Sequence, residues 1–480
     1  MAENTDNLKD NEQPIVTEDA IIIPRSRGVK SIEIDDELMR DIKELAREKA
    51  GPLLLNIITD LHAADIAEII DRLDPDDEQF VFDLLDTPTG SAVLLDLQPE
   101  TRHALLDAMP SERITAYVDL LASDDATDLV AELPPQIADK VLRAMPAEDS
   151  IDVKELLRYD PETAGGIMGT EFVAVQMNDT LGQAIKAVRA VAKKNMVIHS
   201  VYVVDEEGLL VGVLPLQSLV LNSPNRRVYK IMEADAKSIN TDVDQEEVAA
   251  MFRKYDLVTL PVVDKKGVLV GRITIDDIVD VIEAEHSEDV ARLVGSDADE
   301  LEKRSPYQIA LLRLPWVLTT LAIEFLAGVV IHYFDATLSK VILLASFMPI
   351  ISAISGNTGL QSAAIIVRAM STGHVTLDRW FHPLWRQVQT TLIIGSACGI
   401  VIGVVGALWQ GVWEFGLVVG VAMFVSVNLS GVVGTTVPMI SKRLGFDPAL
   451  TAGPFETAFQ DVVGISIFLS LATFMLQWIV

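Results

Sequence analysis

The chain has 480 residues, half of them hydrophobic, with a mean hydropathy of +0.32 and a formal net charge of −32. These values coexist because the charge is segregated: residues 314–480 hold 7 acids and 6 bases, whereas residues 1–313 hold 63 acids and 32 bases. The composition excludes a purely soluble enzyme, and the acidic excess argues against nucleic-acid binding, which needs a basic surface.

Residues 1–35 are polar and unpatterned, which predicts a disordered tail. The first ten residues, MAENTDNLKD, lack the basic and apolar regions of a signal peptide, so we expect this end to stay in the cytosol. The single cysteine, Cys398, allows no internal disulfide.

Residues 36–160 show a helical pattern in which proline and acidic residues recur at the expected helix starts. Pro75, Pro110 and Pro146 are 35 and 36 residues apart, and Pro99 and Pro134 are 35 apart. Pairs of short helices repeating at this period are typical of a small α-solenoid. We therefore predict an acidic, superhelical α-helical N domain.

Residues 161–228 and 229–275 are two copies of one pattern. The phrase IMGTEFVAV at Ile167 is matched by IMEADAKSI at Ile231, and VYVVDEEGLLVGVL at Val201 by LPVVDKKGVLVGRI at Leu260. Each copy is predicted to form a helix, a strand, a turn, a second strand and a helix. The tandem resembles an α/β CBS-domain pair, a family whose cleft often holds adenine nucleotides.

The CBS resemblance implies a cleft pattern of glycine, a hydroxyl residue and aspartate at fixed spacing. The second copy has Gly271, Thr274 and Asp277, whereas the first copy has Pro215 and Ser218 in place of the hydroxyl residue and the acid. ATP binding through Thr274 and Asp277 therefore stays open, and a structural role in dimerisation is the alternative.

Residues 276–313 are predicted to form an acidic connecting helix and a linker into the membrane. Between residues 276 and 289 there are seven acids and no base, at helical spacing. Like charges four residues apart repel one another, as at Asp276 and Asp280. The helix is either a hydrated acidic surface or a set of carboxylates gathered by divalent cations, which prefer oxygen ligands.

Residues 314–480 are predicted to form a transmembrane domain of five helices. Three stretches of 27 residues (341–367, 387–413 and 415–441) carry no charge, which is enough to cross ~30 Å of hydrocarbon. With the N-terminus inside, seven Lys and Arg residues near the spans lie inside and only Lys340 lies outside, in agreement with the positive-inside rule. The C-terminus is then outside, and residues 1–313 are cytosolic.

Two spans carry unusual polar residues. Pro349 and the run SGNTGLQS at residues 355–362 predict a helix that is broken in mid-membrane. Asp461 has no basic partner in the fifth span, and a carboxylate in hydrocarbon costs at least ~2.5–3.5 kcal/mol, which points to a cation path. Glu324 and Glu456 are further acids of the spans, while the hydroxyls and glycines are also explained by helix packing alone.

No enzyme chemistry can be assembled from the motifs present. The sequence has no P-loop, no HExxH and no GxSxG, and its seven histidines form no ligand spacing. We therefore expect a transporter or a membrane-anchored sensor.

This combination of parts resembles the MgtE-type magnesium transporter/channel family over residues 36–480. The most specific segments are RLPW (313–316), FMPIISAISGNTGLQS (347–362) and KRLGFDPALTAGPFETAFQDVVG (442–464). The resemblance implies a homodimer in the plasma (inner) membrane, with spans two and five lining a central pore. It also implies that Mg²⁺ is both the transported ion and a regulatory ligand.

The resemblance further implies the site residues. Asp461 matches the family's pore aspartate, Thr457 a position that offers its backbone carbonyl, and Asn357 the family's glycine-asparagine segment in span two. Gly453 stands where some members carry an asparagine. The cytosolic metal positions that the resemblance implies are Asp447, Glu285, Glu288, Asp289, Asp277, Asp280, Asp244, Asp256, Asp124 and Asp128.

The expected function is Mg²⁺ uptake, stopped when Mg²⁺ binds the acidic cytosolic domains and relieves their mutual repulsion. One alternative is transport of Co²⁺, Mn²⁺ or Zn²⁺, against which stands the shortage of His and Cys near the path. Another is a membrane-anchored CBS protein that senses nucleotides and transports nothing.

Overall fold

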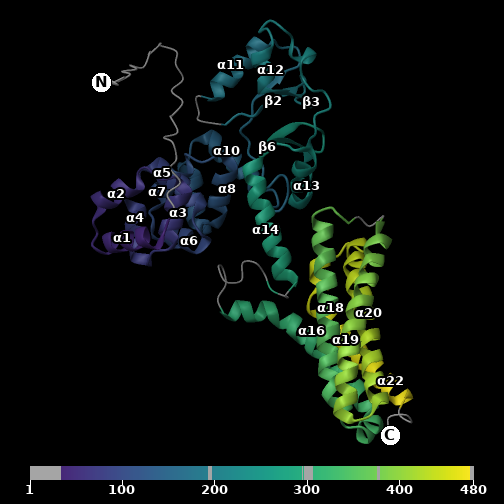
Figure 1. The fold of residues 1–480 in the computed structure, drawn as a ribbon. Coiled ribbons are helices and arrows are strands. Elements are labelled where there is room, and N and C mark those ends of the chain that lie inside the picture. Colours follow the sequence, from purple (N-terminus) through teal and green to yellow (C-terminus); the bar gives the residue numbers. More distant parts are fainter. Residues whose placement is uncertain (1–33, 193–196, 294–295, 297–305, 376–378, 476–480) are drawn as a thin grey trace, which may run out of the picture. The chain divides into compact units, whose positions relative to one another are not determined.

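The computed structural model describes residues 34–192, 197–293, 296, 306–375 and 379–475 (Figure 1). It divides into two compact units, the first made of Met1–Pro161, Met168–Thr241 and Pro261–Arg272, the second of Glu162–Ile167, Asp242–Leu260 and Ile273–Val480. Of the tail predicted at residues 1–35, all but the last two residues lie outside the described part of the chain.

The first unit begins with ten short helices. They are α1 (Asp36–Arg47), α2 (Gly51–Ile58), α3 (Ala63–Asp71), α4 (Pro75–Asp83), α5 (Thr87–Asp96), α6 (Pro99–Ala108), α7 (Ser111–Val118), α8 (Ser123–Glu132), α9 (Pro135–Ala144) and α10 (Ala147–Leu156). The prolines do start helices as predicted: Pro75 and Pro99 are first residues, and Pro110, Pro134 and Pro146 are N-caps. Alternate helices pack on one another, from α3 on α5 to α7 on α9, around one continuous apolar core. This is the superhelical N domain that the repeat predicts.

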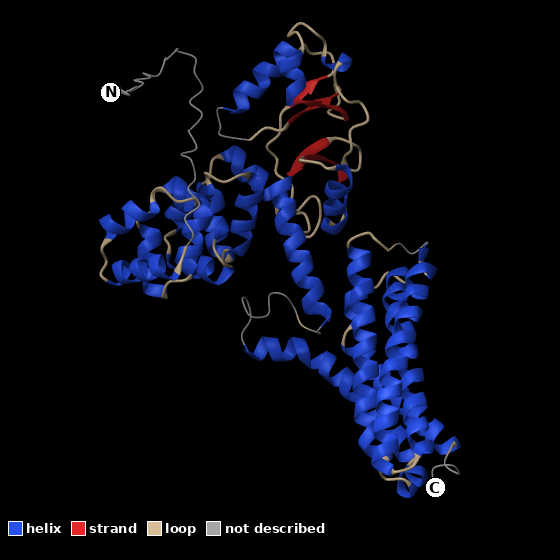
Figure 2. Cartoon of the chain, viewed as in Figure 1, coloured by secondary structure: helices blue, strands red, loops and turns tan. Residues whose placement is uncertain are grey.

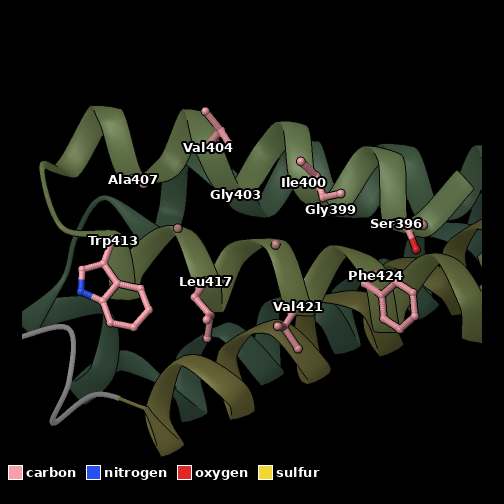
Figure 3. A pocket seen from close by; sticks show the side chains of 13 residues that line it. Ser396, Gly399, Ile400, Gly403, Val404, Ala407, Trp413, Leu417, Val421 and Phe424 are labelled. Atoms are coloured by element: carbon pink, nitrogen blue, oxygen red, sulfur yellow. The ribbon is translucent and has the colours of Figure 1, made fainter. Parts of the chain in front are cut away.

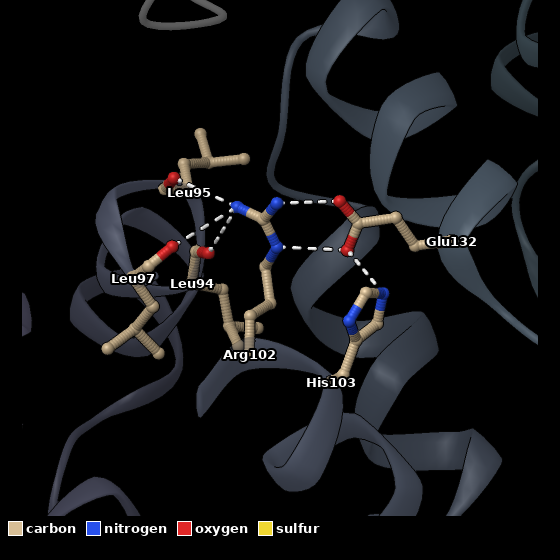
Figure 4. Close-up of polar contacts among 6 residues, drawn as sticks. All are labelled: Leu94, Leu95, Leu97, Arg102, His103 and Glu132. Carbon is tan, nitrogen blue, oxygen red and sulfur yellow. Dashed lines mark hydrogen bonds and ion pairs between the residues drawn. The ribbon is translucent and has the colours of Figure 1, made fainter. Parts of the chain in front are cut away.

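A partly buried ion pair joins α6 and α8 within this domain (Figure 4). Arg102 Nε and Nη2 donate to the two carboxylate oxygens of Glu132 at 2.9 and 2.6 Å, and Nη1 donates to the carbonyl of Leu95 at 3.2 Å. The same Nη1 reaches the carbonyl of Leu97, just past the end of α5. One guanidinium therefore satisfies the carbonyls at the end of one helix and a carboxylate at the end of another.

Because Glu132 would be left without its partner, we expect Arg102→Gln to destabilise this region by about 2–3 kcal/mol. Hydrogen–deuterium exchange of the full chain should show faster exchange at the amides of α6 and α8. The matched control is Arg47→Gln, whose pair with Asp74 is exposed on both sides, so its effect should stay below about 0.5 kcal/mol. Equal effects of the two variants would contradict a special role for the Arg102 pair.

Two three-stranded sheets follow the helices (Figure 2). Their elements are β1 (Ala174–Gln176), α11 (Leu181–Ala192), β2 (Ser200–Val204), β3 (Leu210–Pro215), α12 (Leu216–Leu221), η1 (Val228–Lys230), β4 (Ile239–Asn240), α13 (Gln245–Tyr255), β5 (Thr259–Val263) and β6 (Leu269–Thr274). In each sheet two long strands are neighbours, β2 with β3 and β5 with β6, as predicted for each copy. The short parallel strands β1 and β4, which precede them, were not predicted.

The two copies exchange their leading segments. Gly169, from the phrase IMGTEFVAV of the first copy, pairs with Arg272 of β6. Glu233, from the phrase IMEADAKSI of the second copy, pairs with Val213 of β3. A Cβ on Gly271 would lie 2.9 Å from the carbonyl oxygen of Gly169, so this crossed pairing needs a glycine there. The glycine of the CBS pattern therefore has a packing role that does not depend on a nucleotide.

The second unit contains the connecting helix and the membrane helices. They are α14 (Ile275–Leu293), α16 (Pro306–Tyr333), α17 (Asp335–Lys340), α18 (Leu344–Ser371), α19 (Phe381–Gln410), α20 (Trp413–Arg443), α21 (Pro448–Ala452) and α22 (Pro454–Phe474). In the described part of the chain, α16, α18, α19 and α20 are long and apolar enough to cross a membrane, and α22 has a shorter apolar stretch from Ala458 to Phe474. Most of the linker between α14 and α16 lies outside the described residues.

The helix break expected at residues 355–362 is wrong, because α18 is one continuous helix from Leu344 to Ser371. The hydroxyls of Ser355, Thr358 and Ser362 bond to carbonyls four residues earlier, so the polar run is satisfied inside the helix. Gly359 meets Gly434 of α20 at backbone distance, where a Cβ would collide. The small residues thus allow close helix packing instead of a break.

A second close approach joins α19 and α20. A Cβ on Gly399 would lie 2.7 Å from the Gly420 carbonyl oxygen, and one on Gly403 would lie 2.9 Å from that of Gly416. These glycines form the floor of an open apolar groove whose edges include Trp413 (Figure 3). The facing glycines allow the backbones of α19 and α20 to approach closely, which explains why these two helices pair.

Candidate metal sites and ion path

Asp461 lies on α22, which packs against α16, α18 and α20. The hydroxyl of Ser352, on α18, donates a hydrogen bond to Asp461 Oδ1. Glu324, on α16, is in side-chain hydrogen-bond contact with the same carboxyl group. Asp461 is half-buried, so these neighbours hold it while part of its surface stays uncovered in the single chain.

Buried serines of α18 and α20 line the helix faces beside Asp461. Ser430 donates to the carbonyl of Ser355, and a Cβ on Gly464 would lie 3.2 Å from the Ser355 hydroxyl. The Ser426 hydroxyl is buried, and within the described residues it has no hydrogen-bond partner. Asp461 therefore lies beside a row of serine hydroxyls inside the helix bundle.

The sequence analysis did not predict that Ser352 and Ser426 lie near Asp461. It identified Glu324 as an acid of the first span but did not predict its contact with Asp461. Ser352 and Ser355 are three residues apart in an apolar span, which is a helical spacing that could have marked a polar face. The contact between Glu324 and Asp461 joins the first and last spans, and no local pattern encodes it.

The other predicted path residues are placed as follows. Asn357 lies on an exposed face of α18. Thr457 lies in the first turn of α22, one turn before Asp461, and its side chain is outside the described residues. Gly453 separates α21 from α22, and a Cβ there would collide with the carbonyl of Leu293 at the end of α14. An asparagine side chain would not fit at this position in the present arrangement.

Four predicted metal positions, Glu285, Glu288, Asp289 and Asp447, lie where α14 packs on α21; we call them the junction acids. Asp447 is the N-cap of α21, where Oδ1 accepts from the Ala449 amide at 2.8 Å. Its Oδ2 accepts from Arg292, which also pairs with Glu288. Arg292, which sequence reasoning did not single out, thus links α14 to α21.

The junction acids still carry more negative charge than their neighbours balance. Partial burial, followed by repulsion from Asp447 and Glu285, raises the pKa of Asp289. Burial also raises the pKa of Glu246 on α13, and the opposing effect of Lys442 does not cancel it. Repulsion between neighbouring carboxylates contributes to both shifts, and a cation placed between these groups would reduce it.

A cavity of about 30 Å³ lies between α13, α14 and the end of α18, enough room for about one water molecule. Its lining includes Glu246, Glu285 and Asp289. Gln245 Nε2 donates to Glu285 Oε1 at 2.7 Å, so this carboxylate is already engaged. Within the described residues, no three His, Cys, Asp or Glu side chains are grouped closely enough to hold a metal ion.

Three more predicted positions act as helix caps. Asp244 caps the start of α13 by accepting from the Glu246 amide at 2.8 Å, and Asp256 ends that helix in the left-handed conformation with φ of 50°. Asp277 accepts from the Thr274 hydroxyl at 2.6 Å and from the Thr274 amide at 3.0 Å. The two residues implied for the nucleotide are therefore bonded to each other, and Asp280 follows one turn later on α14.

Asp124 and Asp128 lie one turn apart on α8 in the first unit. Asp124 contacts Gly169, since a Cβ there would lie 2.9 Å from Asp124 Oδ2. Glu171 accepts from both the amide and the hydroxyl of Ser123 at 2.9 Å, and its charge together with burial raises the pKa of Asp152. Glu171 and Asp152 extend this acidic set and were not predicted.

Comparisons with known proteins identify the family. Family models match at residues 348–471 (MgtE, divalent cation transporter), 61–162 (MgtE intracellular N domain), and 164–223 and 228–284 (CBS domain). The magnesium transporter MgtE of Thermus thermophilus is 32% identical over 450 residues, which cover 92% of this chain and 100% of that protein. The magnesium transporter MgtE of Enterococcus faecalis is 35% identical over 329 residues, covering 68% of this chain and 72% of that protein.

A solved structure of the cytosolic domain of the Mg²⁺ channel MgtE in complex with ATP is 32% identical, covers 51% of this chain and 99% of its own, and has a TM-score of 0.48. The relative from Thermus thermophilus matches almost the whole chain, helical repeat, CBS pair and apolar helices included. The chain is therefore a multi-pass membrane protein and not an enzyme, and it belongs to the MgtE family of divalent cation transporters.

Proposed function

We propose that this chain forms a Mg²⁺ channel for uptake, closed from the cytosolic side when Mg²⁺ binds its acidic domains. The observation that carries the proposal is Asp461, a carboxylate inside the helix bundle with no basic partner among the contacts of the described residues. Two relatives that match most of their own length bear the name magnesium transporter.

The donor set around Asp461 suits Mg²⁺. This ion gives up its water reluctantly and is usually bound through one or two carboxylates and retained waters, with no all-protein cage. Asp461 and the serine hydroxyls of α18 and α20 are hard oxygen groups, and Cys398 on α19 is the one cysteine of the chain. Co²⁺, Zn²⁺ and other softer ions would favour nitrogen or sulfur ligands.

A homodimer is proposed because parts of the path are uncovered in one chain. Asn357 is exposed and Asp461 is only half-buried, so a second copy would complete a pore between α18 and α22 of two subunits. The positive-inside pattern supports an orientation with the N domain and CBS pair in the cytosol and the C-terminus outside.

Closure is proposed to occur at the junction acids. Mg²⁺ bound there would be a second link between α14 and α21, beside the ion pair of Arg292 with Asp447. Gly453, at the start of α22, lies against the end of α14, so α14 also contacts the helix that carries Asp461. A ligand shifts such an equilibrium only through its affinity difference between the two states. The pairs Asp277 with Asp280, Asp244 with Asp256, and Asp124 with Asp128 are proposed as further Mg²⁺ positions, and ATP at Thr274 and Asp277 as a second regulatory ligand.

The test is Mg²⁺ entry into liposomes that hold the purified full chain, read by an internal indicator. Flux that stops when Mg²⁺ is raised on the side of the cytosolic domains supports both parts of the proposal. Faster entry of Co²⁺, Mn²⁺ or Zn²⁺ than of Mg²⁺ would favour the other cation transporters. No flux of any cation by folded, correctly oriented protein would favour a nucleotide sensor.

Ser352 should tune the ion site through Asp461. We expect Ser352→Ala to raise the Mg²⁺ concentration for half-maximal flux about tenfold, because a hydrogen bond to a charged group contributes about 1.5–3 kcal/mol. The matched control is Ser396→Ala on α19, whose hydroxyl bonds only to the carbonyl of Leu392 among the described contacts. Unchanged half-saturation in Ser352→Ala would remove this residue from the ion path.

A further inference from the structure

A cavity of about 1350 Å³ lies where the end of α18 meets the start of α19. Ile365, Ile366 and Ala369 of α18 form one wall, and the first turns of α19, from Phe381 to Thr390, form another. The cavity is separate from Asp461 and from the junction acids, none of which lines it.

The polar end of this cavity is cationic. Arg379 and Arg386 line it, and both side chains are exposed. In the described part of the chain, neither guanidinium forms an ion pair or a hydrogen bond, and no acidic residue lines the cavity. His374 and His382 add two further nitrogen-bearing rings. Two arginines that line one cavity, with no acidic side chain among its described lining residues, can receive an anion.

Most of the remaining lining is apolar or aromatic, and Gln387 and Thr390 are its further polar side chains. Trp380 is 48% exposed and Phe381 63% exposed, and their rings meet edge to face at 6.0 Å. Ile365 is 62% exposed on the adjoining surface of α18. Tryptophan beside arginine at the end of a spanning helix is typical of the membrane–water interface. The cavity therefore offers a charged end at headgroup depth and an apolar wall toward the hydrocarbon.

We propose that this cavity binds an anionic phospholipid, with Arg379 and Arg386 on its phosphate group and an acyl chain along Ile365 and Ile366. The apolar wall distinguishes a lipid from free phosphate, which would gain nothing from it. By the positive-inside pattern, the leaflet is the cytosolic one, where anionic headgroups attract basic residues. Lipid binding in this cavity does not depend on which cation the protein carries.

The test is native mass spectrometry of the full chain in detergent with equal amounts of phosphatidylglycerol and phosphatidylcholine. We expect the wild type to retain phosphatidylglycerol preferentially. Arg379→Gln with Arg386→Gln should lower that retention on the order of tenfold and leave phosphatidylcholine unchanged. Arg379→Lys with Arg386→Lys should keep most of it, because the charge remains.

The matched control is Arg443→Gln, an exposed arginine at the end of α20 that does not line the cavity. Equal loss of phosphatidylglycerol in this variant would overturn the proposal, since it would reveal unspecific attraction to basic ends. Displacement of the lipid by millimolar inorganic phosphate would also overturn it, in favour of a free-anion site. Should the double variant fail to fold, Arg386→Gln alone should lower retention about threefold, and no change would count against the site.

Discussion

Replacing Asp461 with asparagine is expected to lower Mg²⁺ flux at least about 100-fold. Asparagine has the same shape and can still accept a hydrogen bond from Ser352, so the helix packing should survive. The charge that would stabilise a cation inside the bundle is lost, and a 100-fold decrease corresponds to about 2.8 kcal/mol. Initial rates of Mg²⁺ entry into liposomes measure the effect.

The matched control for this experiment is Asp335→Asn, the same chemical change at the exposed first residue of α17. Its flux should stay within about twofold of wild type, because an exposed charge in water is strongly screened. Size-exclusion profiles of both variants should match wild type, which keeps a loss of flux separate from a loss of fold. Wild-type flux in Asp461→Asn would refute the proposed ion path.

Neutralising three junction acids, by Glu285→Gln, Glu288→Gln and Asp289→Asn together, is expected to keep the channel open at internal Mg²⁺ concentrations that close the wild type. Burial, followed by repulsion from Asp447 and Glu285, raises the pKa of Asp289, and a cation beside this carboxylate would relieve that repulsion. Without the three acids, Mg²⁺ has little difference in affinity between the open and closed forms. An almost complete shift between two states needs a difference of about 10⁴-fold.

The control neutralises two acids of the same helix that are exposed to solvent. Asp276 and Glu283 are exposed on α14, whereas Glu285, Glu288 and Asp289 are partly covered. Asp276→Asn with Glu283→Gln should leave closure by Mg²⁺ nearly unchanged. Normal closure in the triple variant would place the gate elsewhere, and loss of closure in the control would indicate a general effect of net charge.

Much of the architecture could be predicted because patterns along the chain indicate it. Proline at helix starts and a 35-residue period predicted the helical N domain, and repeated strand phrases predicted the CBS pair. Charge-free stretches predicted the long apolar helices. Each of these signals can be read along the chain, from the spacing or composition of its residues, without knowing how the segments pack.

The expected break in the second span failed for a physical reason. Glycine and hydroxyl residues lower helix propensity when considered locally, but packing can override propensity. Here the serine and threonine hydroxyls bond back to their own helix, and Gly359 admits α20 at backbone distance. Residues 355–362 are therefore a packing surface of α18, and this can be recognised only when α20 is present beside them.

The sequence was enough to predict the division into acidic and apolar halves, the main helical segments and paired strands, and the acids Glu456 and Asp461 in a fifth span without a basic residue. The packing of the helices was needed to show that Asp461 contacts Ser352 and Glu324, and that Arg292 joins α14 to Asp447. Periodicity and caps depend on residues a few positions apart, whereas these contacts span more than 100 positions. Such pairs are set by how whole helices pack, and no single segment contains that information.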